Sequence, residues 1–219
     1  GFPLVDSVVR RSFIATGGTV LATKLALNYG IACNTAGGSH HATSNEGAGF
    51  CVFNDVAVAA KYLTSRGLAN KILIIDLDVH QGNGNSEIFK NDNQVFTFSM
   101  HSKVNYPAKK SVSDLDIELE ENLEDREYID ILKNNLKYLN EKEFDFVFYI
   151  AGVDIHYNDR LGKLKISDNG IFERDELVID NFFSNKIPIC GVLGGGYNED
   201  FNKLVELHSS LHKTCAKFL

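Results

Sequence analysis

Asp78 and His80 stand two positions apart, a few residues after an apolar run over residues 72–75. In an extended chain, side chains two positions apart project to the same side, so this carboxylate and this imidazole can reach one metal ion. Asp154 follows a second apolar run, over residues 147–150, and could supply a third ligand. Three protein ligands leave a coordination position open for water, as in catalytic zinc sites. The pattern predicts a metal site formed by Asp78, His80 and Asp154, and its oxygen-rich ligands also suit ferrous iron.

Tandem histidines, His40 and His41, follow Gly37 and Gly38 in a predicted loop. Near one metal ion, one imidazole could take a proton from an attacking water and the other could protonate a leaving amine. Asp76 is placed to accept a hydrogen bond from one of them. The alternative interpretation is a pair of half-exposed loop histidines, and an aspartate at a strand end is often only a turn or capping residue.

Three glycines at 194–196 precede Tyr197. Glycines let the backbone approach a ligand closely, and a phenol can donate a hydrogen bond to a developing oxyanion. The alternative is an ordinary glycine-rich turn with a packed tyrosine. A phosphate cradle is disfavoured because no Lys-Ser/Thr pair follows the glycines.

The length of 219 residues fits one domain with a substantial core. With 22 basic and 29 acidic residues, the formal net charge is −7, which disfavours direct nucleic-acid binding and favours a cationic partner. No apolar run reaches the roughly 18 residues of a membrane span, and no signal pattern opens the sequence. Four cysteines without C-x-x-C spacing predict free thiols in a reducing compartment. We expect a cytoplasmic protein, or a nuclear one if the source is eukaryotic.

Apolar runs typical of buried parallel strands alternate with helical patterns. The runs cover residues 31–36, 72–75, 95–98, 147–150 and 187–192. Helices are predicted over 16–28 and 53–66, with Gly30 and Gly67 beyond their ends, and helical spacing recurs over 128–139 and 204–215. Residues 111–125 are expected to form a polar, acidic loop. The predicted fold class is α/β, a single domain with an open, mostly parallel sheet and helices on both faces. Because ligands bind at the carboxyl ends of such strands, the polar residues after these runs are the candidate site.

Six ordered segments resemble the zinc-dependent deacetylases of the arginase-deacetylase superfamily, the histone deacetylase family. They are AGGSHHA (36–42), GAGFCVFND (47–55), IIDLDVHQGNGN (74–85), AGVDIH (151–156), DRLGKL (159–164) and LGGGYN (193–198). The QGNG sequence and the opening residues 1–19 are most similar to the class IV branch. Other classes usually have an aspartate where Asn83 stands.

The resemblance implies roles for individual residues. Asp78, His80 and Asp154 match the zinc ligands, and Tyr197 matches the tyrosine that polarises the amide carbonyl. The paired acid and base histidines match His40 and His41, with Asp76 and Asn83 as their partners. An acyl-lysine tunnel would be lined by Gly49, Phe50, Tyr106, Leu161 and Gly195. A structural K⁺ or Na⁺ would be held with the help of Asp76, Asp78, His80, Ser99 and Met100.

The implied function is a zinc-dependent amide hydrolase that removes acetyl or longer acyl groups from lysine side chains of proteins or peptides. Residues 1–219 would form the catalytic domain without the family's N-terminal strand and rim loops. Because an amide cannot stabilise an imidazolium as a carboxylate does, Asn83 predicts a lower pKa for His41 than an aspartate would give.

Three alternatives accompany this prediction. An acetylpolyamine amidohydrolase on the same scaffold would suit the net charge of −7 equally well. A catalytically silent acyl-lysine binder is the second, although every implied catalytic residue is present. An arginase-like site with two manganese ions is disfavoured, because Gly82 stands where the second metal needs a carboxylate. The sequence does not predict an oligomeric state.

Overall fold

The computed structural model describes residue 3 and residues 5–218, so residues 1, 2 and 4 of the class IV-like opening lie outside the described residues. Its centre is a six-stranded sheet in the order β1-β6-β5-β2-β3-β4, with every neighbouring pair parallel. The strands are β1 (Ile31–Cys33), β2 (Ile72–Asp76), β3 (Val95–Ser102), β4 (Leu115–Leu119), β5 (Phe146–Ile150) and β6 (Ile189–Val192). The helices are α1 (Asp6–Tyr29), α2 (Asp55–Ser65), α3 (Asn83–Phe89), α4 (Asp125–Asn140), α5 (Asp168–Phe183) and α6 (Phe201–Cys215), followed by the short 3₁₀ helix η1 (Ala216–Phe218).

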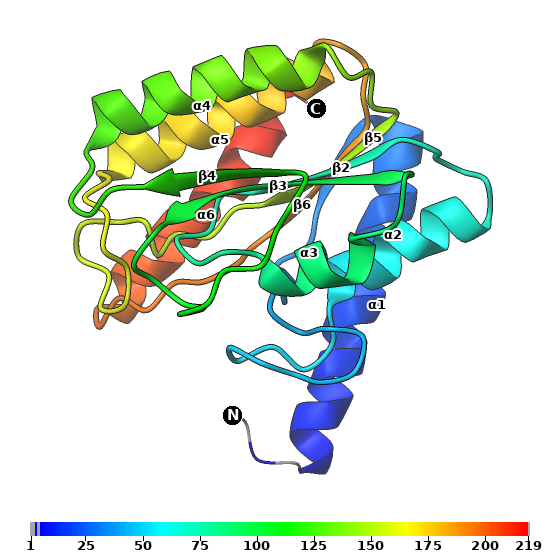
Figure 1. Ribbon diagram of the computed structural model, residues 1–219, viewed down its shortest axis with the longest axis horizontal. Helices are drawn as coiled ribbons and strands as arrows, with labels where there is room; N and C mark the ends of the chain where they lie inside the picture. Colours follow the sequence, from blue (N-terminus) through cyan, green and yellow to red (C-terminus); the bar gives the residue numbers. More distant parts are fainter. Residues whose placement is uncertain (1–2, 4, 219) are drawn as a thin grey trace.

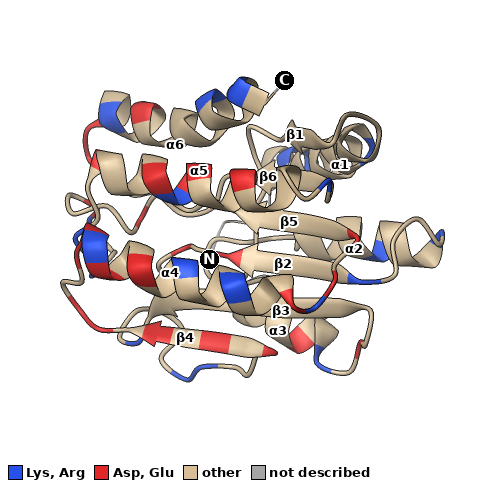
Figure 2. Ribbon diagram, turned by 90° about the horizontal axis from the view of Figure 1, so that it is seen from above, with Lys and Arg blue, Asp and Glu red and all other residues tan. Residues whose placement is uncertain are grey.

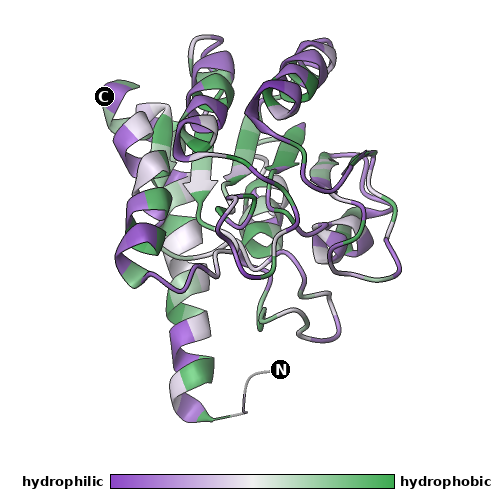
Figure 3. Cartoon of the chain, turned by 90° about the vertical axis from the view of Figure 1, so that its left-hand side faces the viewer, coloured by the Kyte–Doolittle hydropathy of each residue, from purple (hydrophilic) through white to green (hydrophobic). Residues whose placement is uncertain are grey.

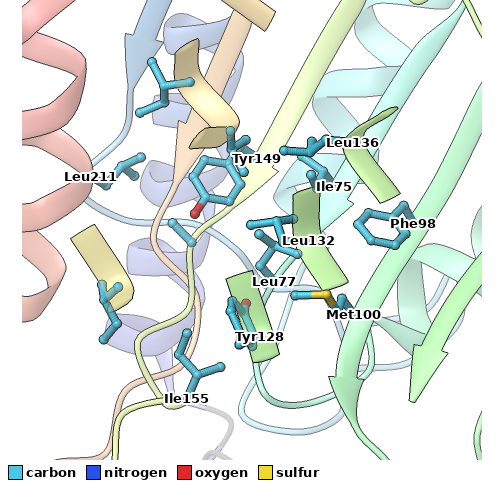
Figure 4. Packing of buried hydrophobic residues seen from close by; sticks show 14 of the residues in the cluster. Ile75, Leu77, Phe98, Met100, Tyr128, Leu132, Leu136, Tyr149, Ile155 and Leu211 are labelled. Carbon is cyan, nitrogen blue, oxygen red and sulfur yellow. The ribbon is translucent and has the colours of Figure 1, made fainter. Parts of the chain in front are cut away.

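Helices cover both faces of the sheet, which confirms the predicted fold class (Figure 1). Alternate residues of the central strands point to opposite faces. Ile75 and Tyr149 pack in one core cluster with Leu132 of α4 (Figure 4). Ile74 and Phe148 pack in a second cluster on the opposite face, which includes residues of α1 and α2. Because both faces of β2 and β5 are buried, these strands have continuous apolar sequences rather than alternating ones.

The acidic segment 111–125 is not a loop throughout, and that prediction was wrong for β4. Leu115, Ile117 and Leu119 alternate there with Asp116 and Glu118, which is the period of a strand with one face toward the core. The strand lies at the edge of the sheet, where charged side chains are tolerated and protect the open edge from other strands. Figure 2 shows the acidic residues along β4.

Other boundaries differ from the predicted ones. The first helix begins at Asp6 rather than at residue 16, the first strand ends at Cys33, and β3 continues to Ser102. Helices α3 and α5 were not predicted. Gly30 and Gly67 do follow α1 and α2, with φ of 86° and 64°, a left-handed conformation that glycine adopts without strain.

The N-terminal turns of α1 extend beyond the rest of the fold and carry apolar as well as polar residues (Figure 3). Phe13 and Ile14 are 63% and 66% exposed there, although the Phe13 ring also contacts that of Phe53 at 4.8 Å between centroids. Among the described residues, no helix combines the length and apolar character that crossing a membrane requires.

Ser167 connects the starts of α4 and α5. Its hydroxyl accepts the backbone NH of Gly170 at 3.1 Å as the N-cap of α5, and donates to Asp125 Oδ2 at 2.5 Å. We expect Ser167→Ala to lower the free energy of unfolding by about 1 kcal/mol, because two polar partners lose their hydrogen bond. Urea denaturation measures this change. Ser184→Ala, in an exposed hydrogen bond at the other end of α5, is the control, and equal effects of the two substitutions would contradict the capping role.

Candidate active site

Asp78, His80 and Asp154 come together at the carboxyl ends of two neighbouring strands, β2 and β5. One ligand atom from each lies within 4.8 Å of the others, and all three residues are buried. His80 Nδ1 lies 3.0 Å from Asp78 Oδ1 and 2.9 Å from Asp154 Oδ2. The segment 78–80 is a bend beyond β2 rather than the extended chain that the spacing argument assumed. The bend turns the His80 ring toward both carboxylates, so the predicted cluster forms by a different local geometry.

Glycines leave the space that these carboxylates occupy. A Cβ atom added at Gly195 would lie 2.1 Å from Asp154 Oδ2, and one at Gly152 would lie 2.3 Å from Asp78 Oδ2. The backbone NH of Gly195 instead donates to Asp78 Oδ2 at 2.5 Å. The glycine-rich sequence after β6 therefore lets the backbone at Gly195 lie directly against the carboxylates of Asp78 and Asp154.

The cluster suits a divalent cation. Burial, and next the neighbouring Asp78, raise the pKa of Asp154 to about 7. Burial opposes the charged form of His80, but hydrogen bonds to Asp154 and Asp78 outweigh it and raise the pKa of His80 to about 10. The two buried carboxylates thus favour the protonated form of the His80 imidazole that lies between them. A cation bound by the same oxygen and nitrogen atoms would replace that proton, and Asp and His are ligands that Zn²⁺ and Fe²⁺ accept.

His40 and His41 lie beside the cluster, with ring centroids 4.0 Å apart. His40 Nδ1 is 2.7 Å from Asp76 Oδ2, and His41 Nδ1 is 2.7 Å from Asn83 Oδ1. Burial disfavours the charged form of His40, yet the Asp76 and Asp78 carboxylates raise its pKa to about 9. Burial, and next the charge of His40, lower the pKa of His41 to about 3. The two adjacent residues therefore differ in charge because one faces a carboxylate and the other an amide.

The loop that carries these histidines is clamped by the first turn of α2. Asp55 Oδ2 accepts the Thr19 hydroxyl at 2.6 Å and the Gly38 backbone NH at 3.2 Å, while Oδ1 accepts the Ser39 NH at 2.8 Å. Asn54 Nδ2 donates to the carbonyl of Ala42 at 3.1 Å. Neither Asn54 nor Asp55 had a predicted role, although both belong to the GAGFCVFND segment (47–55).

The first turn of α3 holds the same loop from its other side. The backbone NH groups of Gly84 and Asn85 donate to the carbonyl of His40 at 2.9 and 3.3 Å. Gly84 must lack a side chain, because a Cβ atom there would lie 2.3 Å from the carbonyl oxygen of Ala42. In the QGNGN sequence, the Asn83 side chain thus hydrogen-bonds to the His41 ring, and the backbone NH groups of Gly84 and Asn85 bind the His40 carbonyl.

Aromatic rings surround the cluster on its open side. The Tyr197 ring lies 6.1 Å from that of His80 and 6.1 Å from that of Phe50. The ring of Tyr106 meets His41 edge-on, with 4.8 Å between centroids. Phe50 and Tyr106 are 57% and 44% exposed, so these predicted substrate-binding side chains border solvent.

Three predicted tunnel residues have no aromatic ring: Gly195, which lies against Asp154, and Gly49 and Leu161. Gly49 has a φ of 50°, and a Cβ atom there would lie 2.3 Å from His41 Cδ2. Leu161 is 37% exposed, and its carbonyl accepts the side chain of Asn105, the residue before Tyr106, at 2.7 Å. Gly49 therefore brings the backbone against His41, whereas Leu161 is linked to the segment of Tyr106 through the neighbouring Asn105.

A cavity of about 450 Å³ extends from the histidines toward α1. Its walls include His40, His41, Gly195 and Tyr197 at one end and Arg11 of α1 at the other. Gly49 and Phe50 also line it, whereas Tyr106 and Leu161 do not. The cavity therefore reaches the Phe50 side of the exposed aromatic rings.

Three of the residues predicted for a monovalent cation, Asp76, Ser99 and Met100, lie on the neighbouring strands β2 and β3, and Asp78 and His80 lie beyond the end of β2. Asp76 of β2 is paired in register with Ser99 of β3, and Met100 follows in the core. The Ser99 hydroxyl lies 2.9 Å from His101 Nδ1 and 3.4 Å from the NH of Gly82. K⁺ or Na⁺ binding by this group stays a prediction.

A buried arginine that the sequence analysis missed supports both strand ends. Arg174 of α5 is 0% exposed and donates to the carbonyl of Gly152 at 2.5 Å and to that of Leu77 at 3.4 Å. Its Nε and Nη2 donate to Asp175 Oδ1 at 3.0 and 2.8 Å, and Tyr149 donates to the same oxygen. The guanidinium therefore ties together the segments that carry Asp78 and Asp154. No sequence spacing indicates this contact, because Arg174 lies on a helix remote from both segments in the chain.

Comparison with known proteins agrees with this geometry. A histone deacetylase domain model matches residues 1–211. The chain belongs to the histone deacetylase family. One relative is an uncharacterized protein of Picosynechococcus sp., 49% identical over 214 residues that cover 97% of this chain and 71% of that protein. Histone deacetylase 2 of Arabidopsis thaliana is 36% identical over 194 residues that cover 86% of this chain and 50% of that protein.

Solved structures of the family share the fold. The crystal structure of a histone deacetylase homolog from Aquifex aeolicus is 28% identical, with a TM-score of 0.78, and the match covers 94% of this chain and 57% of that one. The chain therefore spans about half the length of the Arabidopsis and Aquifex family members. The predicted family membership is confirmed.

Arg174 provides a test of the support beneath the site. We expect Arg174→Met to lower the free energy of unfolding by about 3–5 kcal/mol, because Asp175 and two carbonyls would lose their buried partner. Lys133→Met is the control, since Lys133 forms an exposed ion pair with Glu173 and should change stability by about 0–1 kcal/mol. Guanidinium denaturation measures both variants, and similar midpoints would show that the buried arginine does not hold the strand ends.

Proposed function

We propose that this chain forms the site of a metal-dependent amide hydrolase that removes acetyl or longer acyl groups from lysine side chains. The observation that supports this most directly is the convergence of the buried Asp78, His80 and Asp154 cluster with Tyr197 and two histidines of different charge. Histone deacetylase family membership agrees with it.

Asp78, His80 and Asp154 would hold the cation, with zinc as the proposed metal and ferrous iron as the alternative. When bound, such a cation acts as a Lewis acid that polarises a carbonyl and lowers the pKa of water. The protein itself would supply three ligands. The backbone NH of Val79 orients Asp154, and the backbone NH of Gly195 orients Asp78. Three protein ligands would leave room for water and substrate to bind the cation.

The two histidines would divide the proton transfers between them. His41, paired with the neutral Asn83, is unprotonated at neutral pH and can accept a proton from the attacking water. His40, paired with Asp76, carries a positive charge that favours negative charge developing nearby. The leaving amine then takes a proton from one of these two histidines. This transfer returns the His40–His41 pair to its starting charge.

Tyr197 would donate a hydrogen bond to the carbonyl oxygen of the substrate. Burial, and next the carboxylates of Asp78 and Asp154, raise the pKa of Tyr197, so its phenol keeps its proton at any physiological pH. A neutral donor directed at the position where negative charge develops stabilises the transition state more than the ground state.

The proposed substrate is an acyl-lysine chain that enters beside Phe50 and Tyr106. Both rings are exposed beside the cluster and suit an aliphatic lysine stem. The formal net charge of −7 favours a cationic peptide or, as a second candidate, an acylated polyamine. The QGNG sequence at Asn83 supports a class IV-like enzyme, for which a longer acyl chain is a candidate substrate.

Tyr197→Phe tests the reaction without removing a metal ligand. With zinc loaded, we expect the natural protein to release acyl groups from acetyl- or myristoyl-lysine peptides, and the variant to lose about 100-fold or more of kcat. Its zinc content should be unchanged. Asp154→Asn should instead lose zinc as measured by chelator competition, and Asp180→Asn, on the exposed part of α5, is its matched control.

The substrates in this experiment separate the candidates. Turnover of acetylated polyamines alone would favour the polyamine hydrolase. Zinc binding without turnover of any substrate would favour a silent binder. Full zinc content and full activity in Asp154→Asn would contradict the proposed metal site.

Asn83→Asp tests the assignment of His41. A carboxylate in place of the amide favours the imidazolium, so the pKa of His41 should rise from about 3. Because only neutral His41 accepts a proton, the acidic limb of kcat/KM against pH should move to higher pH by roughly 1–3 units. Asn140→Asp, on the exposed end of α4, controls for the added charge. An unchanged acidic limb in Asn83→Asp would contradict His41 as the base.

A further inference from the structure

Two cysteines from opposite ends of the chain lie against each other outside the candidate active site. Cys33 is the last residue of β1 and Cys215 the last of α6, and their Sγ atoms are 2.9 Å apart across 182 positions of sequence. Cys33 is half-buried and Cys215 is 6% exposed, and both are free thiols. Figure 2 shows the C-terminal end of the chain beside β1.

A missing side chain on the neighbouring strand makes this contact possible. Gly191 of β6 is the register partner of Cys33, and a Cβ atom there would lie 2.9 Å from Cys33 Sγ. The same Cβ atom would lie 3.2 Å from Leu211 of α6. Because Gly191 has no side chain, the Cys33 sulfur of the edge strand β1 has room to contact the last turn of α6.

The pKa values of the two thiols are shifted in opposite directions. The hydrogen bond from Cys215 lowers the pKa of Cys33 to about 6, against the opposing effect of burial, and His212 lowers it further. The same contact and burial raise the pKa of Cys215. The contact thus favours the thiolate on Cys33 and the thiol on Cys215, which is the pairing of a reactive cysteine with a resolving one.

The other two cysteines have different surroundings. Cys51 Sγ donates to the carbonyl of Gly49 at 3.5 Å, and Cys190 Sγ donates to that of Thr19 at 3.9 Å. Burial raises the pKa of Cys51 to about 12 and also raises that of Cys190. Both thiols should stay protonated and inert, so they serve as internal controls.

We propose that Cys33 and Cys215 form a reversible disulfide when the protein meets a peroxide. The Cys33 thiolate attacks one oxygen of hydrogen peroxide and becomes a sulfenic acid, with hydroxide as the leaving group. The Cys215 sulfur then attacks the Cys33 sulfur and loses its proton, and the sulfenic oxygen leaves as water. The balance is two thiols and one peroxide to one disulfide and two waters, with the thiols oxidised by two electrons.

The bond would join the edge strand β1 to the last helix of the fold. A cross-link between positions 33 and 215 restricts the unfolded chain strongly, because the closed loop is long. It also fixes the carboxyl end of β1, after which the chain leads directly to the loop of His40 and His41. This proposal does not depend on the amide-hydrolase function.

Peptide mapping of the full-length chain tests the proposal. The protein is treated with one equivalent of hydrogen peroxide, free thiols are alkylated, and the digest is analysed by mass spectrometry without reductant. We expect a cross-linked peptide that contains Cys33 and Cys215, with Cys51 and Cys190 alkylated and the cross-link removed by a phosphine reductant. The melting midpoint should rise by roughly 10 °C on oxidation and return on reduction.

Two variants and three outcomes decide the result. Cys215→Ser should abolish both the cross-linked peptide and the rise in melting midpoint, while Cys190→Ser should retain both. A sulfinic acid at Cys33 without a cross-link, disulfides between separate molecules, or an equal melting shift in Cys215→Ser would each overturn the proposal. The mapping of the natural protein is decisive even if a variant folds poorly.

Discussion

Buried carboxylates at the carboxyl ends of β2 and β5 are the constraint on which the rest of the structure depends. Asp76, Asp78 and Asp154 are each at most 2% exposed, and an unpaired charge at that depth would exceed what the stability of a single domain can offset. These carboxylates are therefore paired with nearby backbone NH groups and with the imidazoles of His40 and His80. Glycines next to the carboxylates leave the space that these contacts need. A site with so much negative charge is also one that attracts a cation.

The order of the strands makes this concentration of charge feasible. Because β2 and β5 are parallel neighbours, Asp76 pairs in register with Ile150, and the segments beyond both strands emerge side by side. Arg174 donates to the carbonyls of Leu77 and Gly152, which lie one residue before Asp78 and two residues before Asp154. Backbone NH groups hold the carboxylates, and the Arg174 guanidinium holds the backbone carbonyls of the same two segments. These contacts fix the irregular segments that follow β2 and β5. Rigidity there is a condition for placing three ligands on one ion.

The sequence predicted the parts of this arrangement that depend on local pattern. Asp78, His80 and Tyr197 follow apolar runs, so their place at strand ends could be predicted, and the glycine-rich segments indicated close backbone contacts. Arg174 and Asp55 could not be recognised, because a buried charge on a helix looks like any surface charge until its tertiary partners are known. The strand β4 was missed because its acidic residues suggested a loop, whereas an edge strand tolerates such residues on its outer side.

The different partners of His40 and His41 connect this electrostatic constraint to the chemistry. Two imidazolium rings with centroids 4.0 Å apart would repel each other strongly in a buried site, so the pair takes up one additional proton, and with it one positive charge, rather than two. The carboxylate of Asp76 fixes that proton on His40, and the amide of Asn83 orients His41 without attracting a second one. Burial thus produces a neutral imidazole beside a charged one, as the proposed role of His41 as the base requires. The identity of one side chain, amide or carboxylate at position 83, then determines the pH range over which that asymmetry holds.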